Sequence, residues 1–112
     1  MKKIEAIVRD GKITAVKEAL KALGVAGMTV VEVKGHGTQK GITEIYRDRS
    51  YSVDLISKVK FEVVVEDKDL EKVTKCIVEA ARTGSIGDGK IFVYPCENAI
   101  RIRTGESGDK AI

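Results

Sequence analysis

The sequence predicts an α+β domain in which two strand–helix–strand units share one antiparallel sheet. Four short segments rich in β-branched residues flank two longer segments whose apolar residues recur at helical spacing. A polar segment, residues 35–55, separates the two units and keeps no clear period after residue 41. The chain has 112 residues, of which 43% are hydrophobic, which suits one core.

The first unit begins with a strand over residues 4–8. Apolar side chains then recur from Ile13 to Leu23, with lysines and a glutamate between them, and this spacing predicts an amphipathic helix. Gly24 is placed to end that helix. Residues 28–33 are rich in β-branched side chains and are predicted to form the second strand.

The second unit repeats this order. Residues 59–65 alternate and then run apolar, which predicts a third strand. Asp67 is expected to cap a helix over residues 70–80, which ends before Gly84. Residues 91–94 are predicted to form the fourth strand, which a proline ends.

This order is that of a ferredoxin-like double βαβ sandwich with an antiparallel sheet. Two helices cover one sheet face only, yet residues 63–65 form an uninterrupted valine run. A homo-oligomer that packs sheet against sheet would cover the second face. The charged tail from Glu97 onward is expected to lie extended over the surface.

Composition excludes several classes of function. A net charge of +3, without basic runs interleaved with aromatic residues, gives no reason to expect nucleic acid binding. The chain has neither a signal-peptide pattern nor an apolar run of membrane-spanning length. Cys76 and Cys96 are far apart and are expected to be free thiols in a reducing compartment. A cytoplasmic protein is therefore predicted.

Three segments carry glycine beside cationic residues. Residues 82–90 include Gly87, Asp88, Gly89 and Lys90, and glycine lets backbone N–H groups approach an anion closely. A helix cap followed by a turn explains this segment equally well. Residues 34–41 have a similar composition, but they do not open a helix as a dinucleotide-binding loop requires.

The third segment contains Arg101 and Arg103, which point the same way if the chain is extended there. Two guanidinium groups on one face suit a phosphate or a carboxylate. A solvated basic edge is the alternative interpretation.

A catalytic set is not visible in the sequence. The single histidine, His36, has no clustered acidic or thiol partner for metal binding or acid–base chemistry. We therefore expect a sensor and not an enzyme. The alternative is a small ferredoxin-like phosphoryl transferase or ATPase, for which Gln39 is the one candidate to orient water.

These motifs, taken together, resemble the PII nitrogen-regulatory signal proteins over nearly the whole chain. The resemblance rests on ordered motifs at residues 1–7, 27–30, 32–35, 39–41, 43–44, 46–47, 80–84, 86–93 and 99–106.

The resemblance implies a single PII-like domain over residues 1–112, assembled as a homotrimer. It implies that ATP or ADP binds in clefts between subunits, with phosphate contacts from one subunit and the arginine pair from its neighbour. The residues so implied are Thr29, Gly35, Gly37, Thr38, Gln39, Val64, Gly87, Asp88, Gly89, Lys90, Arg101 and Arg103. Thr38 stands where the family often has arginine, which removes one cationic phosphate contact.

The family also binds Mg2+ with ATP, together with 2-oxoglutarate. By resemblance, Gln39 would contribute to the Mg2+ coordination sphere, and the Lys58 ammonium group would pair with a 2-oxoglutarate carboxylate. The residues implied for 2-oxoglutarate are Gln39, Lys40, Gly41 and Lys58.

The segment between the second and third strands, residues 37–55, matches the family's T-loop. By resemblance, its ligand-dependent shape controls ammonium transporters, glutamine synthetase or the regulators of that enzyme, so membrane contact arises only through a transporter. Arg47 matches the arginine that enters an ammonium channel. Tyr51 matches a tyrosine that some members nucleotidylate, and an unmodified loop tyrosine is the alternative.

Overall fold

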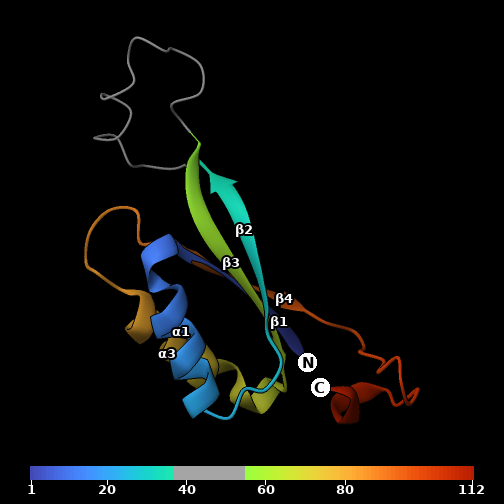
Figure 1. The fold of residues 1–112 in the computed structure, drawn as a ribbon. Helices are drawn as coiled ribbons and strands as arrows, with labels where there is room; N and C mark the ends of the chain where they lie inside the picture. Colours follow the sequence, from blue (N-terminus) through green and yellow to red (C-terminus); the bar gives the residue numbers. More distant parts are fainter. Residues whose placement is uncertain (37–54) are drawn as a thin grey trace.

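The computed structural model describes residues 1–36 and 55–112. Within them, four strands form one antiparallel sheet in the order β2-β3-β1-β4, and two α-helices lie side by side on one face of it (Figure 1). The strands are β1 (Lys2–Arg9), β2 (Thr29–Gly35), β3 (Ile56–Val65) and β4 (Lys90–Pro95). The helices are α1 (Ile13–Ala22) and α3 (Leu70–Ala81), with 3-10 turns η1 (Asp10–Lys12), η3 (Asp67–Asp69) and η4 (Gly108–Ala111). The predicted ferredoxin-like fold is confirmed.

Every predicted strand is present, and each is longer than the sequence pattern indicated. The extra residues at the strand ends are mostly polar, such as Lys2, Arg9 and Ser57, and have little β-propensity of their own. They are extended because the neighbouring strand continues beside them: Arg9 pairs with Lys58, and Lys2 pairs with Val65. Over the described residues, no helix is both long and apolar enough to cross a membrane.

The core lies between the sheet and the two helices. Alternate residues of β1 and β3 point toward the helices, so each strand contributes one apolar row. Phe61, at the centre of β3, is fully buried. The residues packed around it include Ile4, Ala6, Val16, Leu20, Val63, Val73 and Ile77.

The opposite sheet face carries charges in place of a helix layer. Lys3 lies 3.2 Å from both Glu5 and Glu62, and Lys60 lies 3.4 Å from Glu62. Val64 is half-buried on this face, whereas the flanking Val63 and Val65 are buried in the core. Cover for this face by another subunit stays a prediction.

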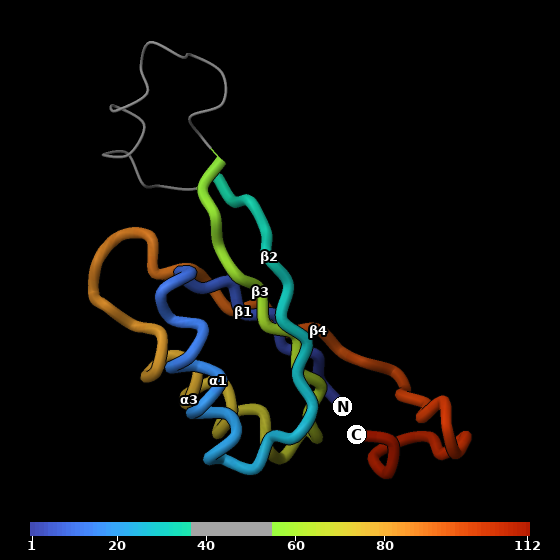
Figure 2. The backbone as a smooth tube through the Cα atoms, viewed as in Figure 1, coloured from blue at the N-terminus to red at the C-terminus, as the bar shows by residue number. Residues whose placement is uncertain are grey.

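Two local expectations were wrong. Asp67 does not cap a helix: it begins η3 without a side-chain cap bond, and its carboxylate lies 3.3 Å from the Lys2 ammonium group. The tail is not extended, since Gly105 adopts a φ of +74° and a bridge joins Ile100 to Ser107. The tail turns back on itself to one side of the sheet, away from the helices (Figure 2).

Candidate functional site

Residues 82–89, called here the glycine loop, connect α3 to β4 and lie against the end of β1. Gly84, Gly87 and Gly89 all have positive φ, with values of +91°, +104° and +100°. A Cβ atom on Gly89 would lie 1.7 Å from the Ile7 carbonyl oxygen. Glycine is therefore required at this position by both conformation and space.

The Asp88 carboxylate holds the glycine loop closed. Its Oδ2 accepts hydrogen bonds from the Thr83 and Gly84 amides at 2.8 and 2.9 Å, and its Oδ1 accepts one from the Thr83 hydroxyl. The Arg9 Nε donates to Oδ1 at 3.0 Å. These donors, those of Thr83 foremost, hold the pKa of Asp88 well below its usual range.

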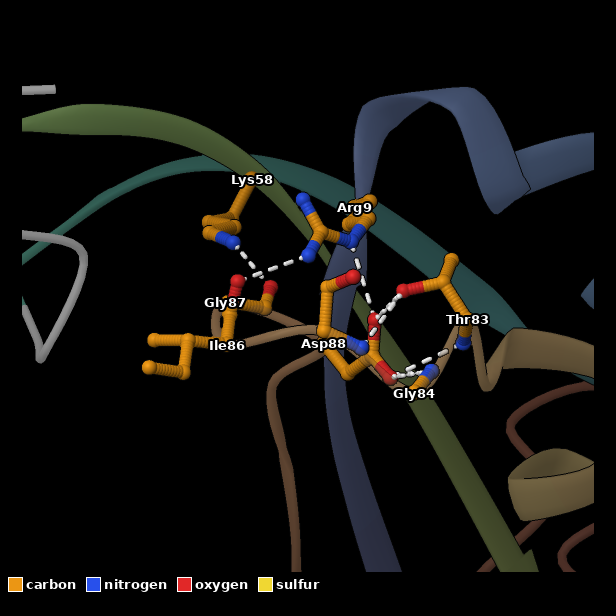
Figure 3. A network of polar contacts seen from close by, with 8 residues as sticks. Arg9, Lys58, Thr83, Gly84, Ile86, Gly87 and Asp88 are labelled. Atoms are coloured by element: carbon orange, nitrogen blue, oxygen red, sulfur yellow. Dashed lines mark hydrogen bonds and ion pairs between the residues drawn. The ribbon is translucent and has the colours of Figure 1, made fainter. Parts of the chain in front are cut away.

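Two cations from the sheet grip the backbone of the same loop (Figure 3). The Arg9 guanidinium donates to the Ile86 carbonyl at 2.8 Å, and the Lys58 ammonium group donates to the Gly87 carbonyl at 2.5 Å. Lys58 is only 8% exposed. Burial, with a smaller contribution from the Arg9 charge, lowers the pKa of Lys58.

Several predicted site residues gather at this end of the sheet. Gly35 pairs with Ile56 at the end of the β2–β3 ladder, and a Cβ on Gly35 would lie 3.5 Å from the Lys58 side chain. Lys90 begins β4 opposite Ile7, directly after the glycine loop. This end thus combines glycine backbone with cationic side chains, which suits an anion such as phosphate or carboxylate.

A second group of predicted residues lies at the other end of the sheet. Thr29 and Val64 line a cavity of about 620 Å³, together with the loop before β2 and the C-terminal Ala111 and Ile112. Thr29 and Gly35 are the two ends of β2, so roughly 20 Å of extended chain separates them. One chain does not bring the two groups together.

The arginine pair also lies apart from the glycine loop. Arg101 and Arg103 are exposed in residues 100–107, called here the tail hairpin. The expected parallel orientation in an extended strand was wrong, because the chain turns at residues 102–104 and the Arg101 amide bonds to the Glu106 carbonyl at 2.8 Å. The Arg101 guanidinium lies 3.7 Å from the Glu106 carboxylate.

Other predicted positions cannot be compared with the fold. The calls on the T-loop lie outside the described residues: Gly37, Thr38, Gln39, Lys40, Gly41, Arg47 and Tyr51. In the described ranges, no cluster of three or more histidine, cysteine, aspartate or glutamate side chains is arranged to hold a metal ion.

Sequence reasoning missed Arg9 and Thr83. Arg9 is 79 positions from Asp88 along the chain, and no periodicity links the two. A weak local signal exists for Thr83, since a threonine with a glycine after a helix and an aspartate five residues later can close a small loop. For Arg9 the sequence shows only a charged residue after an apolar strand, and its contact with the glycine loop becomes visible in the fold.

Known proteins resemble the chain along its whole length. A model of the family described as "Nitrogen regulatory protein P-II" matches residues 1–106. "Nitrogen regulatory protein P-II" of Cereibacter sphaeroides is 58% identical over 112 residues, which is 100% of both chains. "Nitrogen regulatory protein P-II 2" of Methanothermobacter thermautotrophicus is 55% identical over 100% of this chain and 97% of the relative.

A solved structure shares the fold. The Arabidopsis thaliana PII protein, crystallised with citrate bound, superposes with a TM-score of 0.80 at 44% sequence identity. The match covers 99% of this chain and 91% of the Arabidopsis chain.

Proposed function

Because the chain belongs to the P-II family of nitrogen regulatory proteins, we propose that it is a non-enzymatic signal-transduction regulator of nitrogen assimilation that binds ATP or ADP. It would act as one domain over residues 1–112, in the cytoplasm. The single observation that supports a nucleotide site is the glycine loop. Arg9 and Lys58 hold its backbone through the Ile86 and Gly87 carbonyls, and Lys90 directly follows it.

Phosphate groups suit this end of the sheet. Gly87, Asp88 and Gly89 would offer backbone N–H groups to the phosphates, and Lys90, the next residue, would add a point charge. Gly35 would line the same cleft from β2, where its lack of a side chain keeps the approach open. From the T-loop, Gly37, Thr38 and Gln39 would complete the phosphate side.

The separation of the two residue groups supports a site built between subunits. Thr29 and Val64 would contact the base and ribose, but they lie at the far end of the sheet from the glycine loop. Arg101 and Arg103 are likewise remote within one chain. A homotrimer in which each subunit offers its loop to the opposite end of its neighbour would unite them.

The carboxylate effector 2-oxoglutarate would bind next to the phosphates. Lys58 supplies a buried ammonium group there, and Gln39, Lys40 and Gly41 would supply the remaining contacts from the T-loop. Mg2+ held by ATP phosphates and Gln39 would supply further positive charge. The Arabidopsis relative, crystallised with the tricarboxylate citrate, supports affinity for carboxylates in this family.

The T-loop, residues 37–55, would carry the output. Its two ends leave from paired positions, Gly35 and Ile56, beside Lys58 and the phosphate site. Ligands at that site would therefore bias the posture of the loop toward or away from a target. Arg47 and Tyr51 would contact an ammonium transporter, glutamine synthetase or its regulators, and Tyr51 could accept a nucleotidyl group.

Calorimetric titration tests the proposal. We expect ATP and ADP to bind at micromolar to millimolar concentration, and 2-oxoglutarate to bind only when Mg-ATP is present. A protein that takes up neither nucleotide at millimolar concentration contradicts the proposed function. Phosphate release in the same samples distinguishes a regulator from an ATPase: turnover well above background would favour the enzyme.

A further inference from the structure

The glycine loop is shaped by a residue that belongs to neither of the predicted ligand sets. We propose that Arg9 is a positioning residue, which directs the Gly87 amide toward the bound anion by fixing the peptide before it. This inference rests on the proposed function, because the anion is taken to be a nucleotide phosphate.

The geometry of one peptide unit carries the first step. The Arg9 guanidinium binds the Ile86 carbonyl at 2.8 Å, and the peptide that contains this carbonyl also contains the Gly87 N–H. No cis peptide bond is present in the described chain, so the C=O and N–H of this unit point in opposite directions. A carbonyl held toward Arg9 therefore turns the Gly87 amide away from Arg9.

The backbone of Gly87 does not by itself fix the direction of its amide. Its φ is +104°, and glycine without external contacts samples both signs of φ with similar ease. Lys58 holds the other side of the same residue through the Gly87 carbonyl. The two cations thus fix successive carbonyls, and with them the direction of the amide that lies between these carbonyls.

The shape of the guanidinium explains why the cation on β1 is arginine. Its Nε donates to Asp88 while its terminal nitrogen donates to Ile86, so one planar group spans two positions of the loop. An ammonium group is a point donor and does not match both acceptors from the same stem. Arg9 also pairs with Lys58 in the β1–β3 ladder, which places both cations at one level of the sheet.

Asp88 extends this control to the start of the loop. Its carboxylate joins Arg9 to the Thr83 and Gly84 amides, so Asp88, near the end of the glycine loop, is tied to residues near its start. Arg9 and Asp88 form a single unit in this scheme. Removing either member should therefore disturb the Gly87 amide to a similar extent.

The test uses the full-length protein with Arg9→Gln, Arg9→Lys and a control, Lys75→Gln. Lys75 is an exposed residue of α3 outside the glycine loop, so the control removes one positive charge without touching the Arg9 contacts or the proposed site. We expect Arg9→Gln to weaken ATP binding about tenfold, as for loss of one charge-assisted hydrogen-bond arrangement. Arg9→Lys should recover only part of that loss, and Lys75→Gln should change affinity less than about twofold.

A double-mutant cycle separates positioning from direct phosphate contact. If Arg9 acts through Asp88 and Ile86, Arg9→Gln combined with Asp88→Asn should weaken ATP binding no more than the stronger single variant. Additive losses would overturn the proposal, because they would mean that Arg9 acts on the ligand independently.

Amide hydrogen exchange in the ligand-free protein tests the role of Arg9 independently of whether the protein binds ATP. Arg9→Gln should accelerate exchange at Thr83 and Gly84 and shift the Gly87 amide resonance, while the thermal midpoint stays close to wild type. Unchanged exchange and an unchanged Gly87 resonance would overturn the positioning role, whether or not ATP binds. Failure of the wild-type protein to bind ATP would instead refute the proposed function.

Discussion

The glycine loop and the tail hairpin both carry residues implied in anion binding, but they are held in different ways. The glycine loop is fastened by side chains from β1 and β3, through Arg9 and Lys58. The tail hairpin is fastened by its own bonds, such as the Arg101 amide to the Glu106 carbonyl and the Gly105 amide to the Arg101 carbonyl. Its Ile102 is 99% exposed.

This difference separates what one chain can preorganise from what it cannot. Contacts within one chain hold the glycine loop, because Arg9 of β1 and Lys58 of β3 bind it from distant parts of the sequence. The tail hairpin keeps a local turn, and against the described residues its Ile100 and Ile102 side chains stay 66% and 99% exposed. An apolar side chain left almost wholly in water suggests that its packing surface belongs to another copy of the chain.

The largest expected effect is a loss of stability when a side chain is added at Gly89, where the glycine loop contacts β1. Gly89→Ala should destabilise the protein by at least about 3 kcal/mol, because its Cβ would overlap the Ile7 carbonyl and its φ is positive. Gly105→Ala in the tail hairpin has a positive φ but open space around it and should lose only about 1 kcal/mol. Urea denaturation measures both, and equal losses would refute the contrast.

The next effect concerns affinity. Lys90→Ala should weaken ATP binding by about 1.5–3 kcal/mol, since it removes a charge-assisted contact. Calorimetric titration gives the value, and Lys110→Ala in the tail is the matched control at an exposed lysine. Unchanged affinity in Lys90→Ala would move the phosphate site away from the glycine loop.

A smaller effect is expected on assembly. Ile102→Asp should weaken subunit association by about 1–2 kcal/mol while leaving the subunit folded, because the described residues of its own chain leave the Ile102 side chain 99% exposed. Val78→Asp alters an exposed apolar residue on the helix layer and serves as the control. Sedimentation equilibrium distinguishes them. Identical behaviour of the two variants would mean that the tail hairpin stays in solvent.

The smallest effect is a pH dependence. The folded-state pKa of Asp88 lies below its unfolded value, so the unfolded chain takes up the proton first and the stabilisation is lost as pH falls below about 4. Asp88→Asn should be less stable than wild type at neutral pH, and the gap should narrow toward pH 2. Between pH 6 and 8 the gap should stay constant. A gap that widens in acid would contradict the assigned direction.

Local patterns predicted most of the fold because β3 and both helices have periodic apolar rows, and β2 is rich in β-branched residues. In β3, α1 and α3 the spacing of apolar residues indicates both the type of element and the face that is buried. The strand ends were missed because pairing, not propensity, extends them. Asp67 resembles a helix cap in sequence, but a 3-10 turn precedes the helix and the carboxylate reaches Lys2 instead.

The candidate site was predicted less completely. The glycines of the loop and Lys90 are visible as a composition, whereas the clamp by Arg9 depends on tertiary folding across 79 positions. Lys58 was implied by resemblance alone, because a lysine in an alternating strand normally lies in solvent and nothing local shows that this one is buried. The arginine pair was assigned the wrong backbone, since Gly105 reverses the chain within the motif.

The pairing of Gly35 with Ile56 has a consequence for how such a protein can diversify. Cross-strand partners lie only about 5 Å apart, so any segment that joins these two residues starts and ends at nearly the same point of the sheet. For a flexible loop in general, doubling the length raises the entropic free-energy cost of closure by only about 0.6 kcal/mol. The intervening stretch can therefore be replaced by one of another sequence or length while the sheet and the helices stay unchanged.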